Sequence, residues 1–105
     1  MNKLLVCLFL VGNVCTAHAT SFNCKAAKSP DEKTVCGDTV LGLLDSEMSQ
    51  KYKKIINKLS GKEKDSAIDG QTGWIAERKD CKRNVYCLRK LYVERINELD
   101  KALKK

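Results

Sequence analysis

The chain has 105 residues, of which 43% are hydrophobic and 31% charged, and its 20 basic side chains outnumber its 13 acidic ones to give a net charge of +7. This length allows one small domain. The single histidine, His18, lies in a segment that we expect to be removed, which excludes histidine-based catalysis and histidine metal ligands from the mature protein.

The first 19 residues have the pattern of a secretory signal peptide. Lys3 precedes an apolar run over 4–14, and Ala17-His18-Ala19 has the small residues that such signals carry at their cleavage site. The run is shorter than the roughly 20 apolar residues that a membrane anchor needs. Cys15 could carry a lipid, but the residues before it match a lipoprotein signal poorly. We therefore expect a signal peptide over 1–19 and a secreted or periplasmic product that starts at Thr20.

The mature chain, 20–105, has 19 basic and 13 acidic side chains, so its net charge is +6. This charge favours anionic partners and repels cationic ones at long range. Four cysteines in a small exported chain predict two disulfides, for which three connectivities exist. We favour the local pairs Cys24–Cys36 and Cys81–Cys87, because each flanks a predicted helix end. Neither pair has the C-x-x-C spacing of a redox motif.

The first predicted helix is short and begins after Ser29. Ser29 suits the N-cap, Pro30 suits the first helical position, and Glu32 can complete a capping box. Cys36-Gly37 should end the helix, because glycine adopts the C-terminal capping conformation without strain.

Three longer helices follow, over about 38–59, 62–81 and from about 84 or 85 to the C-terminus. Apolar residues recur in them at three- and four-residue steps, and no strand-like alternation occurs. In the third helix Gly70 and Gly73 each cost about 1 kcal/mol relative to alanine. A kink, or the close approach of a neighbouring backbone, would explain them. The fold class is therefore all-α: a single disulfide-stapled bundle of three to four helices over 20–105.

Two aromatic–arginine pairs border the predicted turn between the last two helices. Trp74 and Arg78 lie one helical turn apart, as do Tyr92 and Arg95. We favour a scaffold role in which Trp74 fills the core and Arg78 pairs with an acid such as Asp45. The alternative is that the four residues form a binding surface, since tryptophan, tyrosine and arginine are enriched at interface hot spots.

A lysine stripe, defined as Lys51, Lys54 and Lys58, lies beside the apolar face of the second long helix. It could bind an anionic envelope polymer. A solvated helix face is the favoured interpretation, because Glu47 and Glu63 lie nearby. Nucleic acid is not expected as a partner, since basic and acidic residues are interleaved.

The order and spacing of one set of residues resembles a known family. The set comprises Phe22-Asn23-Cys24, Ala27, Glu32, Val35-Cys36, Leu44-Asp45, Tyr52, Trp74, Arg78, Cys81, Cys87-Leu88, Tyr92 and Arg95-Ile96. With its W-x-x-x-R-x-x-C and C-L-x-x-x-Y-x-x-R motifs, the chain resembles the N-terminal domain of lysozyme inhibitor LprI-like proteins, which are small exported bacterial helical domains. The resemblance covers nearly the whole mature chain.

The resemblance implies binding to a lysozyme-type glycan hydrolase and inhibition without catalysis, so we expect no enzymatic activity, no cofactor and no metal. Common lysozymes are strongly basic, and a partner of charge +6 would be repelled unless a local acidic patch compensates. The best predicted patch is Asp31, Glu32, Asp38 and Asp45. The alternative function is an envelope module that binds an anionic cell-wall polymer or a partner protein through the lysine stripe.

The processing prediction can be checked on the exported protein. We expect an intact mass that corresponds to a chain starting at Thr20, with two disulfides and no lipid. A diacylglyceryl adduct on Cys15 would show instead that the chain is a lipoprotein.

Overall fold

The computed structural model describes residues 20–105, so the predicted signal peptide lies outside the described residues. A 3-10 turn η1 (Cys24–Ala26) leads into helix α1 (Pro30–Gly37), and three long helices follow: α2 (Thr39–Lys58), α3 (Gly61–Asp80) and α4 (Val85–Leu103). No strand occurs over 20–105. The all-α prediction is confirmed, and the long helices lie within one or two residues of their predicted bounds.

Side chains and backbone geometry define the helix ends. Asp38 and Asn84 cap α2 and α4, with side-chain oxygens that accept from Leu41 N and Cys87 N at 2.9 Å. Gly61, the first residue of α3, has a φ of +57°, which a glycine adopts without the strain of a Cβ. The turn between α3 and α4 contains Lys82 at a φ of +53°.

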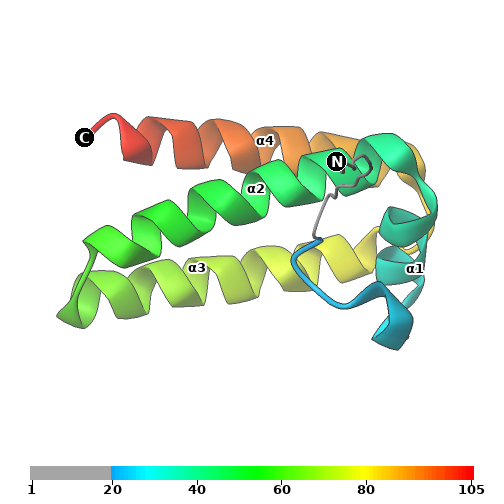
Figure 1. Cartoon of the computed structure of the whole chain (residues 1–105), viewed down its shortest axis with the longest axis horizontal. Helices are drawn as coiled ribbons and strands as arrows, with labels where there is room; N and C mark the ends of the chain where they lie inside the picture. The colour runs from blue at the N-terminus through cyan, green and yellow to red at the C-terminus, as the bar shows by residue number, and fades with distance from the viewer. Residues whose placement is uncertain (1–19) are drawn as a thin grey trace, which may run out of the picture.

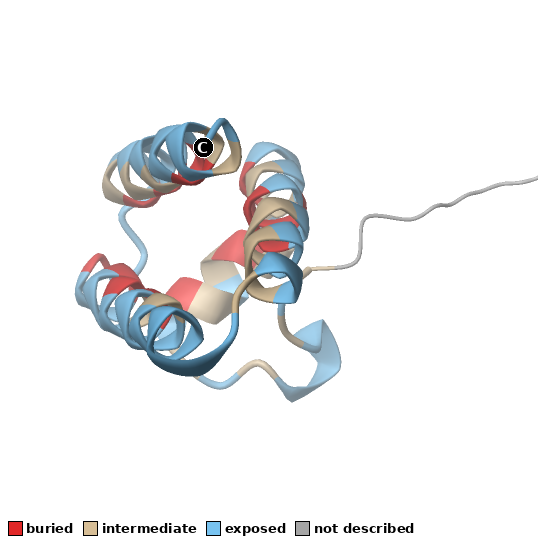
Figure 2. Cartoon of the chain, turned by 90° about the vertical axis from the view of Figure 1, so that its left-hand side faces the viewer, coloured by how far each residue is buried: buried red, intermediate tan, exposed pale blue. Residues whose placement is uncertain are grey.

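Helix α2 packs mainly on α4, and these two helices form the largest interhelical contact. Helix α3 runs alongside them, and α1 closes the end of the bundle at which the α3–α4 turn lies, opposite the C-terminus (Figure 1). Seen end-on, the buried positions of α2, α3 and α4 face one another around a single core (Figure 2). Its buried apolar residues are Val35, Leu41, Met48, Trp74, Cys81, Leu88, Tyr92, Ile96 and Leu99.

Both predicted disulfides are confirmed. Cys24–Cys36 ties η1 to α1 with a Cα–Cα distance of 5.8 Å, and Cys81–Cys87 closes the α3–α4 turn with a Cα–Cα distance of 5.6 Å. On the chain-entropy model, loops this short each stabilise the fold by roughly 2–3 kcal/mol. The two disulfides therefore fix the same end of a small bundle whose core alone would be marginal.

Three local expectations differ from the structure. The φ of Gly37 is not positive, so this residue does not act as a left-handed cap. Ser29 makes no capping hydrogen bond, and the Glu32 carboxylate accepts instead from the backbone N of Lys28 at 3.2 Å. Helix α3 runs unbroken through Gly70 and Gly73, and a Cβ at either position would meet no atom within 4 Å. Close backbone approach therefore does not explain these glycines.

Trp74 is a core residue with 6% of its surface exposed. Its ring meets the Tyr92 ring edge to face at 5.0 Å, and its Nε1 donates to the Leu91 carbonyl at 3.3 Å. We predict that Trp74→Ala lowers the free energy of unfolding by about 3–5 kcal/mol, because the cavity cannot fully collapse. Thermal or urea unfolding measures the loss. Tyr86, with 78% of its surface exposed, provides the control, and Tyr86→Ala should leave stability nearly unchanged. A Trp74→Ala variant as stable as the wild type would contradict the scaffold role.

Candidate functional site

A buried ion pair joins α3 to α1. Arg78, with 3% of its surface exposed, donates from Nε to Asp31 Oδ2 at 2.7 Å, and its Nη2 lies 3.9 Å from Glu32 Oε2. The guanidinium also lies 5.1 Å from the centroid of the Phe22 ring and 5.7 Å from that of the Trp74 ring. The prediction that Arg78 pairs with an acid is right, but the named acid was wrong, because Asp31 and not Asp45 accepts its hydrogen bond.

Asp45 instead joins α2 to α4 and to the entry segment. Its Oδ1 accepts from the Tyr92 hydroxyl at 2.7 Å and from Ser21 Oγ at 2.9 Å, and its Oδ2 accepts from the Ser21 backbone N. The carboxylate has no exposed surface. Phe22 brings the two systems together, since it follows Ser21 in the chain and stacks on Arg78. We call Asp31, Asp45, Arg78 and Tyr92 the buried polar network, to which the exposed Ser21 adds its hydrogen bonds from the surface.

Burial and charge shift the titration of this network. Burial would raise the pKa of Asp31, but hydrogen bonds to its carboxylate together with the charge of Arg78 outweigh this effect, so the pKa falls below its ordinary value of 3.8. Burial raises the pKa of Tyr92, and the neighbouring Asp45 carboxylate raises it further. Tyr92 therefore remains a hydrogen-bond donor at any ordinary pH. Asp31 and Tyr92 thus each keep one protonation state near neutral pH, which suits a structural role and not proton transfer.

The four candidate binding residues do not form one exposed surface. Trp74, Arg78 and Tyr92 are buried with 6%, 3% and 0% of their surface exposed, which supports the scaffold interpretation for all three. Arg95 lies nearer the surface, where its Nε and Nη2 donate to Gln71 Oε1 at 3.1 and 2.9 Å and its Nη1 donates to Glu98 at 3.2 Å. Of the four, Arg95 alone is positioned to meet a partner without unfolding.

The predicted acidic patch is wrong. Asp31 and Asp45 are fully buried in the polar network, and Asp38 is engaged as the N-cap of α2. Glu32 and Asp38 are partly exposed, and 23% of the Glu32 side chain is accessible. With two of its four carboxylates buried and a third engaged as a helix cap, this set does not form the exposed acidic patch that a basic partner would need.

The lysine stripe is only partly free. Lys51 donates from Nζ to Asp100 at 2.6 Å and lies 3.7 Å from Glu47, and the hydrogen bond to Asp100 raises its pKa. Lys51 thus links α2 to the end of α4, while Lys54 and Lys58 are exposed. Two free lysines on one face form a weak site for an anionic polymer, because each phosphate or carboxylate contact is screened by salt.

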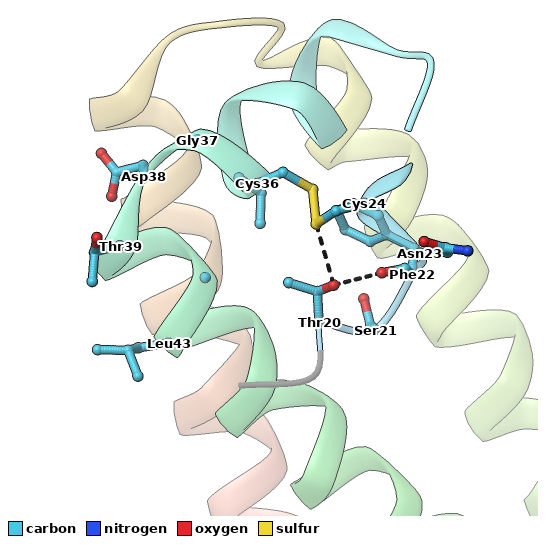
Figure 3. A pocket seen from close by; sticks show the side chains of 12 residues that line it. Thr20, Ser21, Phe22, Asn23, Cys24, Cys36, Gly37, Asp38, Thr39 and Leu43 are labelled. Carbon is cyan, nitrogen blue, oxygen red and sulfur yellow. Dashed lines mark hydrogen bonds between the residues drawn. A yellow bond between two sulfur atoms is a disulfide. The ribbon is translucent and has the colours of Figure 1, made fainter. Parts of the chain in front are cut away.

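A hollow of about 730 Å³ lies beside the entry segment, and Figure 3 shows it from close by. Its wall combines the Cys24–Cys36 disulfide with small polar residues and Leu43 of α2. Within it the Thr20 hydroxyl donates to the Phe22 carbonyl. Asp38 is its one charged side chain and already caps α2. Over 20–105 no group of three potential ligands could hold a metal ion. The hollow therefore offers a ligand no charged side chain that is not already engaged.

A second groove, of about 300 Å³, runs between α3 and α4. Four carboxylates line it, and we call it the acidic groove, defined by Asp69, Glu77, Glu94 and Glu98. All four residues are exposed. None of the four was predicted from the sequence as a binding residue. The signal was present on α3, where residues 69, 73 and 77 follow one another at four-residue steps and so share one helix face.

Comparisons with known proteins give one match. A family model described as lysozyme inhibitor LprI matches residues 24–99. No curated protein and no solved structure shows a match. Within the residues that the structure describes, none of the helices has the length and hydrophobicity that crossing a bilayer would require.

Asp31 tests the energetic role of the buried polar network. Because its folded-state pKa is lowered, its ion pair should stabilise the fold above pH 4 and lose that contribution as the pH falls further. We predict that Asp31→Asn costs about 3–5 kcal/mol at pH 7, since it leaves a buried guanidinium short of its counterion. The difference from wild type should shrink between about pH 4 and pH 2.

Unfolding curves recorded across this pH range measure the effect. The exposed Asp65 on α3 provides the control, and Asp65→Asn should follow the wild-type profile. A difference between Asp31→Asn and wild type that stays constant with pH would show that the ion pair contributes little.

Proposed function

The chain belongs to the lysozyme inhibitor LprI family, and from that membership we propose that it binds a lysozyme-type glycan hydrolase in the bacterial envelope or outside the cell and blocks it without chemistry. The family match over residues 24–99 is the observation that carries this proposal, because it spans every helix almost completely. In this proposal the folded domain binds over the partner's glycan-binding cleft and prevents the substrate from entering it.

The rigidity of the bundle supports this mode of action. Two disulfides and the buried polar network hold η1, α1 and the ends of α2, α3 and α4 in one arrangement. A surface that is already ordered loses little conformational entropy when it docks. Inhibition by occlusion requires this property more than it requires reactive groups.

The carboxylates also support a non-catalytic role. Hydrolysis of a glycoside needs two carboxyl groups that flank the bond of a bound sugar. Asp31 and Asp45, the two most deeply placed carboxylates, have no exposed surface and are engaged with Arg78 and Tyr92. They cannot reach a substrate while the fold is intact.

The alternative function, binding of an anionic envelope polymer through the lysine stripe, predicts a different kind of protection. A cationic protein that coats a cell wall would shield it from lysozyme without touching the enzyme. Its effect should depend on the substrate and should fall steeply with added salt.

A pair of inhibition assays separates the two functions. We predict that the mature, oxidised protein inhibits a basic c-type lysozyme acting on cell-wall suspensions and, equally, on a neutral chito-oligosaccharide. Occlusion of the cleft affects both substrates, whereas wall coating affects only the anionic one. Reduced and alkylated protein is the control and should inhibit much less.

Protection of the wall with no effect on the neutral oligosaccharide would favour the polymer-binding module. No inhibition of either substrate, in the presence of correctly folded protein, would contradict inhibition of this class of lysozyme.

A further inference from the structure

The acidic groove differs in charge from the rest of the molecule. Its four carboxylates face one cation, Arg95, which is already paired with Glu98 at 3.2 Å. Within the described residues, Asp69, Glu77 and Glu94 take part in no ion pair, so their charges are directed to solvent. A neighbouring hollow shares Glu77, Leu91 and Glu94 and extends toward the α3–α4 turn, where Asp80 and the exposed Lys90 add one charge of each sign. On a chain of net charge +6, negative potential is therefore concentrated between α3 and α4.

Two glycines keep this groove open. Gly70 and Gly73 lie in the interior of α3 and line the groove, where each weakens the helix relative to alanine. Neither has a positive φ, and a Cβ at either position would meet no atom within 4 Å. Neither backbone conformation nor packing within the chain therefore requires glycine here. Because they lack side chains, the two glycines leave space in the groove for a side chain of a partner.

The base of the groove is rigid. Trp74 and Leu91 contribute its apolar part, and the hydrogen bond from Trp74 Nε1 to the Leu91 carbonyl ties α3 to α4 beneath it. The Cys81–Cys87 disulfide fixes the turn that joins the same two helices. From Asp69 to Asp80 the α3 side extends over about 16 Å, which is long enough for several side chains of a partner.

We propose that the acidic groove is the surface through which this protein docks on the lysozyme-type hydrolase, with lysine and arginine side chains of the enzyme entering between α3 and α4. This inference rests on the proposed function and adds the surface and its chemistry. It also resolves the charge conflict, because a local negative surface can orient a basic enzyme despite the positive net charge. The exposed lysines of α2, by contrast, would repel a basic partner.

The charge of the groove can be tested with matched double variants. Glu77→Gln with Glu94→Gln removes two groove carboxylates, while Glu47→Gln with Glu63→Gln removes two exposed carboxylates elsewhere, so both variants change the net charge equally. At about 0.1 M salt, where screening acts over about 10 Å, we expect the groove variant to bind a basic c-type lysozyme about tenfold more weakly than wild type. The control variant should bind within about twofold of wild type. Equal weakening by both variants would contradict the proposal.

The shape of the groove can be tested without changing its charge. Gly73→Leu places a side chain in the groove, whereas Ala76→Leu adds the same bulk at an exposed position of α3 that does not line the groove. Because leucine is the better helix former, Gly73→Leu should keep or raise the melting temperature while it weakens lysozyme binding at least about tenfold. Ala76→Leu should bind as wild type does. A folded Gly73→Leu variant with wild-type affinity would overturn the proposal.

The experiments distinguish an error in the groove proposal from an error in the proposed function. If wild type binds and inhibits the lysozyme but the groove variants do so equally well, the docking surface lies elsewhere and only the groove proposal fails. If wild type itself neither binds nor inhibits, both proposals fail together.

Discussion

The structure depends on two buried carboxylates that connect its helices. Asp31 of α1 accepts from Arg78 of α3 at 2.7 Å, and Asp45 of α2 accepts from Tyr92 of α4 at 2.7 Å and from Ser21 of the entry segment. A buried carboxylate is costly unless hydrogen bonds or a counter-charge compensate it. Arg78 supplies both to Asp31, and Tyr92 and Ser21 supply hydrogen bonds to Asp45, so these contacts admit few alternative arrangements. In a chain too small for a large apolar core, they set the relative positions of elements that hydrophobic packing alone would hold loosely.

The polar residues therefore have two roles: those in the interior stabilise the fold, and those on the surface are available to a partner. The aromatic and arginine residues that stand out in the sequence are engaged in the interior, and the residues available to a partner are carboxylates, lysines and glycines on the helix surfaces. A binding surface on such a bundle is built on rigid helices and not on loops, which fixes its shape before the partner arrives. The acidic groove has this character, since both of its walls are helices joined by a hydrogen bond and a disulfide.

Local patterns in the sequence predicted the helices, their bounds and both disulfides, because apolar spacing and cysteine proximity are local properties. The hydrogen-bond partners within the core could not be predicted in this way, because they depend on how distant helices pack. Asp45 was expected to meet Arg78, but the packing of α2 on α4 gives this carboxylate to Tyr92, and α1 supplies Asp31 in its place. The predicted acidic patch was wrong for the same reason, because the burial of Asp31 and Asp45 also depends on how the helices pack. The spacing on α3 predicts that Asp69 and Glu77 share one helix face. The sequence does not show that Glu94 and Glu98 of α4 lie opposite them, because this depends on how the two helices pack.

In the proposed complex, a basic lysozyme contacts the carboxylates between α3 and α4. Zero-length carbodiimide cross-linking of the mature protein with a c-type lysozyme tests it most directly, since this reagent joins only carboxylates and amines that are already in contact. Mass spectrometry of the digested product then identifies the residues joined. We predict links from Asp69, Glu77, Glu94 or Glu98 to lysines of the lysozyme. Links confined to Glu47, Glu63 or other carboxylates outside the groove would contradict the claim.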